Sequence, residues 1–175
     1  ILVPFAALLW CFGIHGTIII ISVLMPLMLQ AFAANAAAYA QGGYGALVFY
    51  PVALFGALAT CGGSGNTLPL VIFGLKAKSE QIRAVSKIAL VPGWFGINEP
   101  VTFGMPIMYN PILCIPYVLN VIVVMACTLF MYKIGFLVPG FVPIMTLMPM
   151  GFGAFLSTLR WQNAIWDYLT MIPAG

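Results

Sequence analysis

The sequence opens with a long apolar run, Ile1 to Leu29, that contains no Asp, Glu, Lys or Arg. A helix that crosses a membrane needs about 20 consecutive apolar residues, so this run is long enough to span one. The pattern continues along the chain, because 63% of the residues are hydrophobic and 5% are charged, against roughly 25% charged in an average soluble domain. So few charges cannot cover the surface of a soluble fold. The sequence therefore predicts an all-α integral membrane protein that contacts the lipid bilayer.

The apolar runs predict how the chain crosses the membrane. A chain of 175 residues has room for roughly five or six spanning or half-spanning segments. We expect a spanning helix over Ile1 to Leu29, an interfacial helix or ordered connection over Gln30 to Gly43, and another span over Ile107 to Tyr132. Because the chain begins within an apolar pattern, without an initiator methionine or a polar leader, we expect residues 1–175 to be a fragment of a longer polypeptide.

Two of the apolar regions are interrupted. The region Tyr44 to Leu75 is broken at Gly62 to Asn66, and the region Ile88 to Met105 is broken at Asn98-Glu99-Pro100. Proline disfavours the helical conformation in the residue before it, so we expect Glu99 at a helix end or in an unwound stretch. Interrupted apolar segments are typical of the binding sites of membrane transporters. The sequence therefore predicts a multi-span helical transport domain with two re-entrant or broken-helix hairpins.

One short segment carries most of the positive charge. Lys76 to Lys87 holds four of the six basic residues, and loops rich in Lys and Arg lie on the cytoplasmic side of membranes. We therefore expect this segment to be cytoplasmic. The net charge of +3 follows the topology in this interpretation, and we expect no nucleic-acid partner.

The sequence lacks the patterns of familiar metal and enzyme sites. The four cysteines lie in apolar surroundings without metal-ligand spacing, so we predict neither a disulfide framework nor a metal site; they are Cys11, Cys61, Cys114 and Cys127. No Ser-His-Asp arrangement, paired carboxylates or dinucleotide fingerprint occurs, and the GGSG stretch lacks the lysine and hydroxyl of a phosphate-binding loop. We expect no cofactor and no stand-alone soluble enzyme.

The strongest candidate functional residues are Glu99 and His15. Glu99 lies among apolar and aromatic residues, and His15, the single histidine, lies near the middle of the first apolar run. An ionisable side chain inside a membrane is costly, so it is usually functional. The pair could bind the same polar ligand and accept a proton from its hydroxyl. Two simpler interpretations stay open: the Glu99 carboxylate could be solvated at a loop tip, and a carbonyl could satisfy a buried His15.

Other residues near the chain breaks could contact a ligand. Asn98 and Asn66 offer donors and acceptors beside the breaks, and Gly16 and Gly65 leave room for a ligand or another backbone. The flat rings of Trp10 and Trp94 suit the apolar face of a sugar, although tryptophans near helix ends also act as interfacial anchors; these two residues complete the set of candidates.

Three motifs together resemble a known family. The stretches WCFGIHG, CGGSGNTLPLVI and FGINEPVTFGMPIMYNP occur in this order between Trp10 and Pro111. They are similar to segments of the sugar-translocating IIC components of the bacterial phosphoenolpyruvate phosphotransferase system (PTS), lactose/cellobiose (diacetylchitobiose) type. One departure is near the C-terminus, where the family often has Trp-Thr-Thr-Pro and this chain has Thr146-Leu147-Met148-Pro149.

The resemblance implies a specific function. The chain would be the C-terminal, sugar-binding transport domain of a IIC permease in the bacterial cell membrane, and the absent N-terminal half would form a homodimer. Its substrate would be a β-linked disaccharide such as cellobiose, chitobiose or lactose. His15 and Glu99 would hydrogen-bond the sugar at the hydroxyl that is phosphorylated, with help from Asn98, and Trp10 would stack on a ring. The phosphoryl donor would be a phosphocysteine on a separate soluble IIB component, docking near Lys76 to Lys87.

Two other classes of function remain possible at this point. In an ion- or proton-coupled secondary transporter, Glu99 and His15 would relay protons. In a membrane scaffold without transport activity, the same polar residues would only hold helices together. The effects of Glu99→Gln and His15→Ala on sugar binding, on pH-driven uptake and on stability would discriminate between the three classes.

Overall fold

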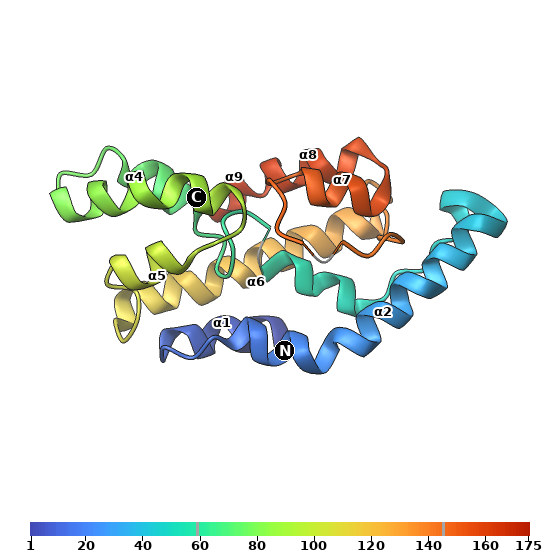
Figure 1. Cartoon of the computed structure of the whole chain (residues 1–175), viewed down its shortest axis with the longest axis horizontal. Coiled ribbons are helices and arrows are strands. Elements are labelled where there is room, and N and C mark those ends of the chain that lie inside the picture. Colours follow the sequence, from blue (N-terminus) through green and yellow to red (C-terminus); the bar gives the residue numbers. More distant parts are fainter. Residues whose placement is uncertain (59, 145) are drawn as a thin grey trace.

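The computed structural model describes residues 1–58, 60–144 and 146–175, and the regular structure in these ranges is helical (Figure 1). The all-α prediction is confirmed. Short 3₁₀ helices are labelled η. The elements in chain order are α1 Leu2–Cys11, α2 Gly16–Gly42, η1 Gly43–Ala46, η2 Pro51–Leu58, α3 Leu68–Gly74, α4 Glu80–Trp94, α5 Glu99–Gly104, α6 Pro111–Lys133, α7 Phe152–Thr158, α8 Trp161–Leu169 and α9 Met171–Ala174.

The long helix α6 is the centre of the packing. It contacts α1, η2 and α9, while α3 and α5 pack against α4, and α7 packs against α8. Figure 1 shows α1 and α2 along one side of the molecule and α4, α8 and α7 along the other. Fully buried side chains from α1, α3, α4, α5 and α6 meet in one apolar core; among them are Ala6, Val71, Ala89, Val101 and Val121.

The predicted single span over the first apolar run is wrong, because the chain breaks after Cys11. Residues 12–15 form a turn, and the His15 Nδ1 atom accepts a hydrogen bond of 3.2 Å from the Ile18 N–H to cap the start of α2. A Cβ atom at Gly16 would collide with the carbonyl oxygen of Ala6, so the two helices cross at backbone contact. The break changes direction without adding charge, and for this reason the hydropathy of the run does not reveal it.

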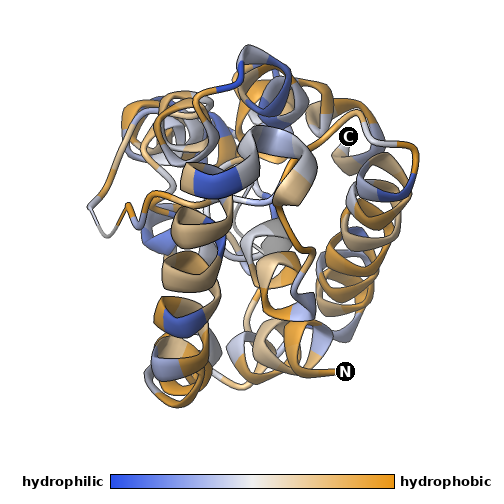
Figure 2. Cartoon of the chain, turned by 90° about the vertical axis from the view of Figure 1, so that its right-hand side faces the viewer, coloured by the Kyte–Doolittle hydropathy of each residue, from blue (hydrophilic) through white to orange (hydrophobic). Residues whose placement is uncertain are grey.

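The segment Gln30 to Gly43, predicted to be an interfacial helix or an ordered connection, is helical up to Gly42 but is part of α2 and not a separate element. α2 continues through it to Gly42 without interruption, because the alanines in this stretch are the strongest helix formers. Many large apolar side chains of α2 are exposed, among them Ile18, Val23 and Leu27, and the hydropathy colouring shows apolar residues along the outward-facing helices (Figure 2). α2 and α6 are long and apolar enough to cross a membrane.

The predicted span over Ile107 to Tyr132 is confirmed as α6. Its start is fixed by Asn110, whose side-chain oxygen accepts a 3.1 Å hydrogen bond from the Ile112 N–H, and by Pro111 at the first helical position. Lys133 lies in the last turn, where a positive charge interacts favourably with the helix dipole.

Both predicted helix breaks are present. The first separates η2 from α3 with a turn that includes Gly62 to Asn66, and the second separates α4 from α5 with a turn over residues 95–98. Glu99 is the first residue of α5, as the following proline predicts. The two turns lie against each other in the middle of the molecule, because the Asn98 side chain hydrogen-bonds the Ser64 carbonyl.

Candidate functional site

The fold brings together His15 and Glu99, which are 84 residues apart in the sequence. The His15 Nε2 atom lies 3.5 Å from the Glu99 Oε1 atom, and the two side chains keep 33% and 43% of their surface exposed. His15 is placed by the turn between α1 and α2, and Glu99 by the start of α5. The imidazole and the carboxylate are therefore paired and still accessible to a ligand.

A hydrogen bond to His15 determines which ring nitrogen carries the proton when the imidazole is neutral. Since Nδ1 accepts the Ile18 N–H, the proton of a neutral ring must be on Nε2, the atom that faces Glu99. The Nε2–Oε1 separation of 3.5 Å is longer than a normal N–H···O bond. A hydroxyl group placed beside the pair can therefore accept a hydrogen bond from Nε2 and donate one to the carboxylate.

Trp10 packs directly behind this pair. Its ring centroid lies 4.2 Å from that of His15, and its Nε1–H donates to the Thr17 hydroxyl at 3.4 Å. Trp10 is 1% exposed, so in this structure its ring supports His15 and has little free face for a sugar. The Thr17 hydroxyl also hydrogen-bonds the Ser64 hydroxyl at 2.5 Å, which ties the start of α2 to the first turn.

Ser64 is the point at which the two turns are joined. Its carbonyl oxygen accepts hydrogen bonds of 2.7 Å from Asn98 Nδ2 and from the Tyr117 hydroxyl. Asn98 also donates to the Thr102 hydroxyl at 3.1 Å and is 3% exposed. The Asn98 amide nitrogen is therefore occupied by protein groups, and the side chain fixes the turn that leads directly into Glu99.

Gly65 and Asn66 shape the first turn. Both have positive φ angles, +85° and +52°, and a Cβ atom at Gly65 would overlap the ring of Tyr117. Glycine is therefore required where the turn passes the tyrosine. Asn66 is fully buried, and its Oδ1 atom accepts a 3.2 Å hydrogen bond from the Cys61 N–H.

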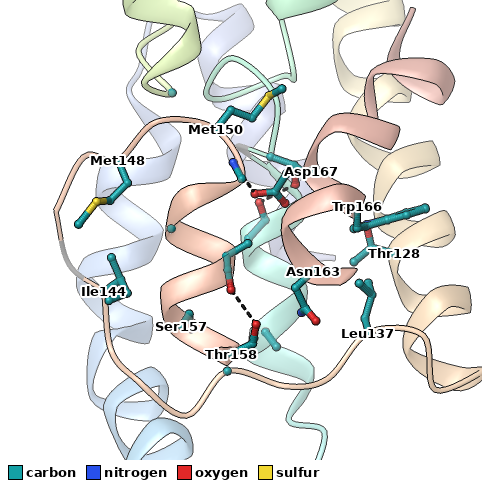
Figure 3. A pocket seen from close by; sticks show the side chains of 18 of the residues that line it. Thr128, Leu137, Ile144, Met148, Met150, Ser157, Thr158, Asn163, Trp166 and Asp167 are labelled. Atoms are coloured by element: carbon teal, nitrogen blue, oxygen red, sulfur yellow. Dashed lines mark hydrogen bonds between the residues drawn. The ribbon is translucent and has the colours of Figure 1, made fainter. Parts of the chain in front are cut away.

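A cavity of about 490 Å³ borders the two turns (Figure 3). Gly62 from the first turn, Gly96 from the second and Trp94 at the end of α4 form part of its wall. Residues of α2, η2, α6, α7, α8 and the loop before α7 form the rest. His15, Glu99 and Trp10 do not line it. Trp94 is instead packed on Tyr168, with ring centroids 5.6 Å apart, and it borders the cavity away from the imidazole–carboxylate pair.

The structure thus separates the predicted site residues into two groups and leaves Trp94 outside both, at the cavity wall. His15, Glu99 and Trp10 form the pair and its support, and the glycines and asparagines fix the backbone around it. Sequence reasoning missed Thr17, Ser64 and Tyr117. Ser64 lies inside a recognised motif and Thr17 directly follows one, whereas Tyr117 lies in an ordinary apolar helix and carries no comparable signal.

Broken helices that meet beside accessible ionisable groups are typical of the binding sites of membrane transporters. The comparisons with known proteins agree. Residues 1–121 match the family described as phosphotransferase system, EIIC, and the chain belongs to this family. Family membership and the two long apolar helices make it an integral membrane protein.

Individual relatives cover most of this chain. It is 35% identical to the lichenan permease IIC component of Bacillus subtilis over 86% of its length, and 36% identical to the oligo-beta-mannoside-specific EIIC component of the same organism over 94%. The crystal structure of ChbC, the IIC component of the N,N'-diacetylchitobiose-specific phosphotransferase system, matches 99% of the chain with a TM-score of 0.89 and 32% identity. The chain spans 34%, 37% and 40% of these three proteins.

Proposed function

We propose that this chain is the sugar-binding transport domain of a PTS permease, and that His15 and Glu99 hold the sugar hydroxyl that becomes phosphorylated. The observation that carries the proposal is the accessible imidazole–carboxylate pair, with atoms 3.5 Å apart at the meeting point of two broken helices. An ionisable pair in a membrane domain is costly unless it has a function.

The pair suits a neutral hydroxyl better than an ion. The Nε2–H of His15 donates to the hydroxyl oxygen, and the Glu99 carboxylate accepts the hydroxyl proton. When the oxygen attacks the phosphorus, the carboxylate takes the proton as general base, the new O–P bond forms, and the bond between phosphorus and the donor sulfur breaks. Holding the hydroxyl in this geometry also lowers the entropic part of the barrier.

The donor in this proposal is a phosphocysteine on a soluble IIB component. Cys11 and Cys61 are buried and Cys114 and Cys127 are partly buried, so the cysteines of this chain are poorly placed for that role. The segment Lys76 to Lys87 carries four basic residues and leads into α4. We propose that it lies on the cytoplasmic face and attracts the IIB component.

The remaining parts of the proposal concern the whole permease. The relatives named for lichenan, oligo-beta-mannoside and N,N'-diacetylchitobiose support a β-linked disaccharide or short oligosaccharide as substrate. We propose that residues 1–175 are the C-terminal transport domain, and that an N-terminal half outside this sequence forms the homodimer.

Sugar binding to the full-length parent protein tests this function. We expect one β-linked disaccharide from a panel of mono- and disaccharides to bind saturably in detergent or nanodiscs. Glu99→Gln should weaken binding by at least about tenfold, because hydrogen bonds to charged groups contribute roughly 1.5–3 kcal/mol. Glu80→Gln is the matched control, since Glu80 is 92% exposed and forms an ion pair with Arg83 across one helical turn.

Three results would overturn the proposal. They are a folded parent that binds no sugar, equal effects of the Glu99 and Glu80 substitutions, and uptake that requires a pH gradient and is uncoupled by Glu99→Gln. The last result would instead indicate a proton-coupled carrier.

A further inference from the structure

One residue ties the segment that carries the imidazole of the pair to the segment that carries the carboxylate. The Tyr109 backbone N–H donates a 2.9 Å hydrogen bond to the Cys11 carbonyl, and the Tyr109 hydroxyl donates a 2.8 Å hydrogen bond to the Phe12 carbonyl. Among the residues that the structure describes, these are the hydrogen bonds between residues 1–16 and residues 95–110. The two segments are therefore bonded to each other at a single residue.

These two bonds complete the C-terminal end of α1. The last carbonyls of a helix have no partner inside the helix. The carbonyls of Leu9 and Trp10 accept N–H groups of the turn that follows α1, whereas the next two carbonyls accept the two donors of Tyr109. The point at which α1 ends and the turn begins is therefore fixed by a residue 97 positions beyond Phe12.

Tyr109 makes both bonds from an unfavourable backbone conformation. Its φ angle is +58°, in the left-handed region where a Cβ atom crowds the backbone. Such residues persist where the surrounding structure holds them, and they are concentrated at ligand sites and switch regions. Gly13 makes room for the hydroxyl, because a Cβ atom at this glycine would lie 3.3 Å from the Tyr109 Oη atom. The local structure therefore accommodates the tyrosine hydroxyl closely.

The position of the turn after α1 determines how far the imidazole lies from the carboxylate. His15 ends this turn, and Glu99 begins the helix α5 that precedes Tyr109 in the chain. A further contact between the two segments comes from Phe103 on α5, whose ring centroid lies 6.3 Å from that of Trp10, behind the imidazole. Hydrogen bonds weaken steeply away from their normal geometry. A small shift of the turn therefore weakens the hold of the pair on a hydroxyl.

We propose that Tyr109 is a positioning residue, which keeps the imidazole and the carboxylate at the separation that a sugar hydroxyl requires. The proposal rests on the proposed function of the pair. Tyr109 does not contact the sugar: its hydroxyl acts through the Phe12 carbonyl on the turn, and the turn carries the imidazole. Tyr109 is 76% exposed, so the stability of the fold depends little on this hydroxyl, and its effect on sugar binding can be measured separately.

A double-mutant cycle separates this role from a purely structural one, in which Tyr109 would only lead the chain into α6. Tyr109→Phe removes the hydroxyl and keeps the ring and the backbone N–H. His15→Asn removes the imidazole and keeps a side-chain oxygen that can cap the start of α2. The effects of independent residues add, whereas the effects of residues that act through each other do not.

We expect Tyr109→Phe in the full-length parent to weaken binding of a disaccharide about three- to fivefold, the effect of losing one neutral hydrogen bond. The probe is whichever of cellobiose, N,N'-diacetylchitobiose and lactose binds the parent most tightly. In the His15→Asn background, the same substitution should change the affinity by less than about 1.5-fold, because the group that Tyr109 positions is gone.

Two further variants complete the experiment. Tyr44→Phe is the matched control, since the exposed Tyr44 hydroxyl also donates to a backbone carbonyl, that of Leu159 at 3.2 Å. It should leave the affinity unchanged in both backgrounds. Tyr109→Gly removes the hydroxyl and the ring, keeps the N–H that bonds Cys11, and adopts a positive φ angle without strain. It should weaken sugar binding at least as much as Tyr109→Phe.

The outcomes are distinguishable from failure of the proposed function. If the wild-type parent binds no sugar, the proposed function fails and this inference fails with it. If binding depends on Glu99 but Tyr109→Phe has no more effect than Tyr44→Phe, or the same effect with and without the imidazole, only the positioning inference is overturned. If His15→Asn binds too weakly to measure, Glu99→Gln replaces it in the cycle, and additive effects there overturn the inference.

Discussion

The Tyr117 hydroxyl offers a sharp test of how the two turns are held together. It donates to the Ser64 carbonyl at 2.7 Å and accepts from Asn98 Nδ2 at 3.3 Å. Tyr117→Phe removes both contacts and keeps the ring that packs against Gly65. The substitution therefore isolates the hydrogen bonds from the packing.

The stability lost in Tyr117→Phe depends on the hydrogen bonds that Ser64 and Asn98 retain. Ser64 retains its 2.7 Å bond from Asn98, and Asn98 retains Ser64 and Thr102 as acceptors. No buried group loses its last partner, so the loss is the net value of a hydrogen bond, about 1 kcal/mol, and not the larger penalty of an unsatisfied group. If all of that free energy were expressed in the sugar complex, affinity would fall at most about fivefold.

Equilibrium unfolding of the full-length parent in mixed micelles measures the loss of stability, and a sugar-binding assay measures the loss of affinity. Tyr44→Phe is the matched control, since the Tyr44 hydroxyl donates to the Leu159 carbonyl at 3.2 Å in an exposed position. It should cost less than Tyr117→Phe and leave sugar affinity unchanged. Equal effects of the two substitutions, or a loss above about 3 kcal/mol for Tyr117→Phe, would refute the reasoning.

Three further substitutions each test one other contact of the fold. Gly16→Ala should destabilise the protein by more than about 2 kcal/mol, because the new Cβ atom collides with the Ala6 carbonyl in a tightly packed crossing; unchanged unfolding would contradict the close approach. Asn163→Ala should cost about 2–3 kcal/mol, because it leaves both backbone groups of Val138 without their side-chain partner, and chemical unfolding measures this loss. Ser64→Ala removes the hydrogen bond between the Ser64 and Thr17 hydroxyls but keeps the Ser64 carbonyl and its partners. It should reduce sugar affinity in the binding assay, while the free energy of unfolding falls by about 1 kcal/mol or less.

The elements with a local sequence cause were predictable. Pro100 fixes the residue before it, so Glu99 lies at a helix start. Glycine and asparagine mark the break at Gly62 to Asn66, and α6 begins at an Asn-Pro pair. The membrane class follows from composition, which depends on no contact at all.

The features that escaped prediction depend on contacts between distant residues. The turn after Cys11 lies in a run whose hydropathy never changes, and its stability comes from the His15 cap and the crossing at Gly16. The importance of Tyr117 arises only when α6 passes the first turn. Asp167 was visible as one of three acids, but its position beside a cavity could be found only in the fold.

The bonds to the Ser64 carbonyl also constrain the order in which the protein is made. Its partners Asn98 and Tyr117 lie 34 and 53 residues further along the chain. At about 5–20 residues per second, a ribosome needs roughly 2–7 s after Ser64 to supply Asn98, the first of these partners. A carbonyl without a partner is not stable in lipid. The first broken helix therefore stays in water or against the insertion machinery until Asn98 has been made, and it enters the bilayer together with the second broken helix.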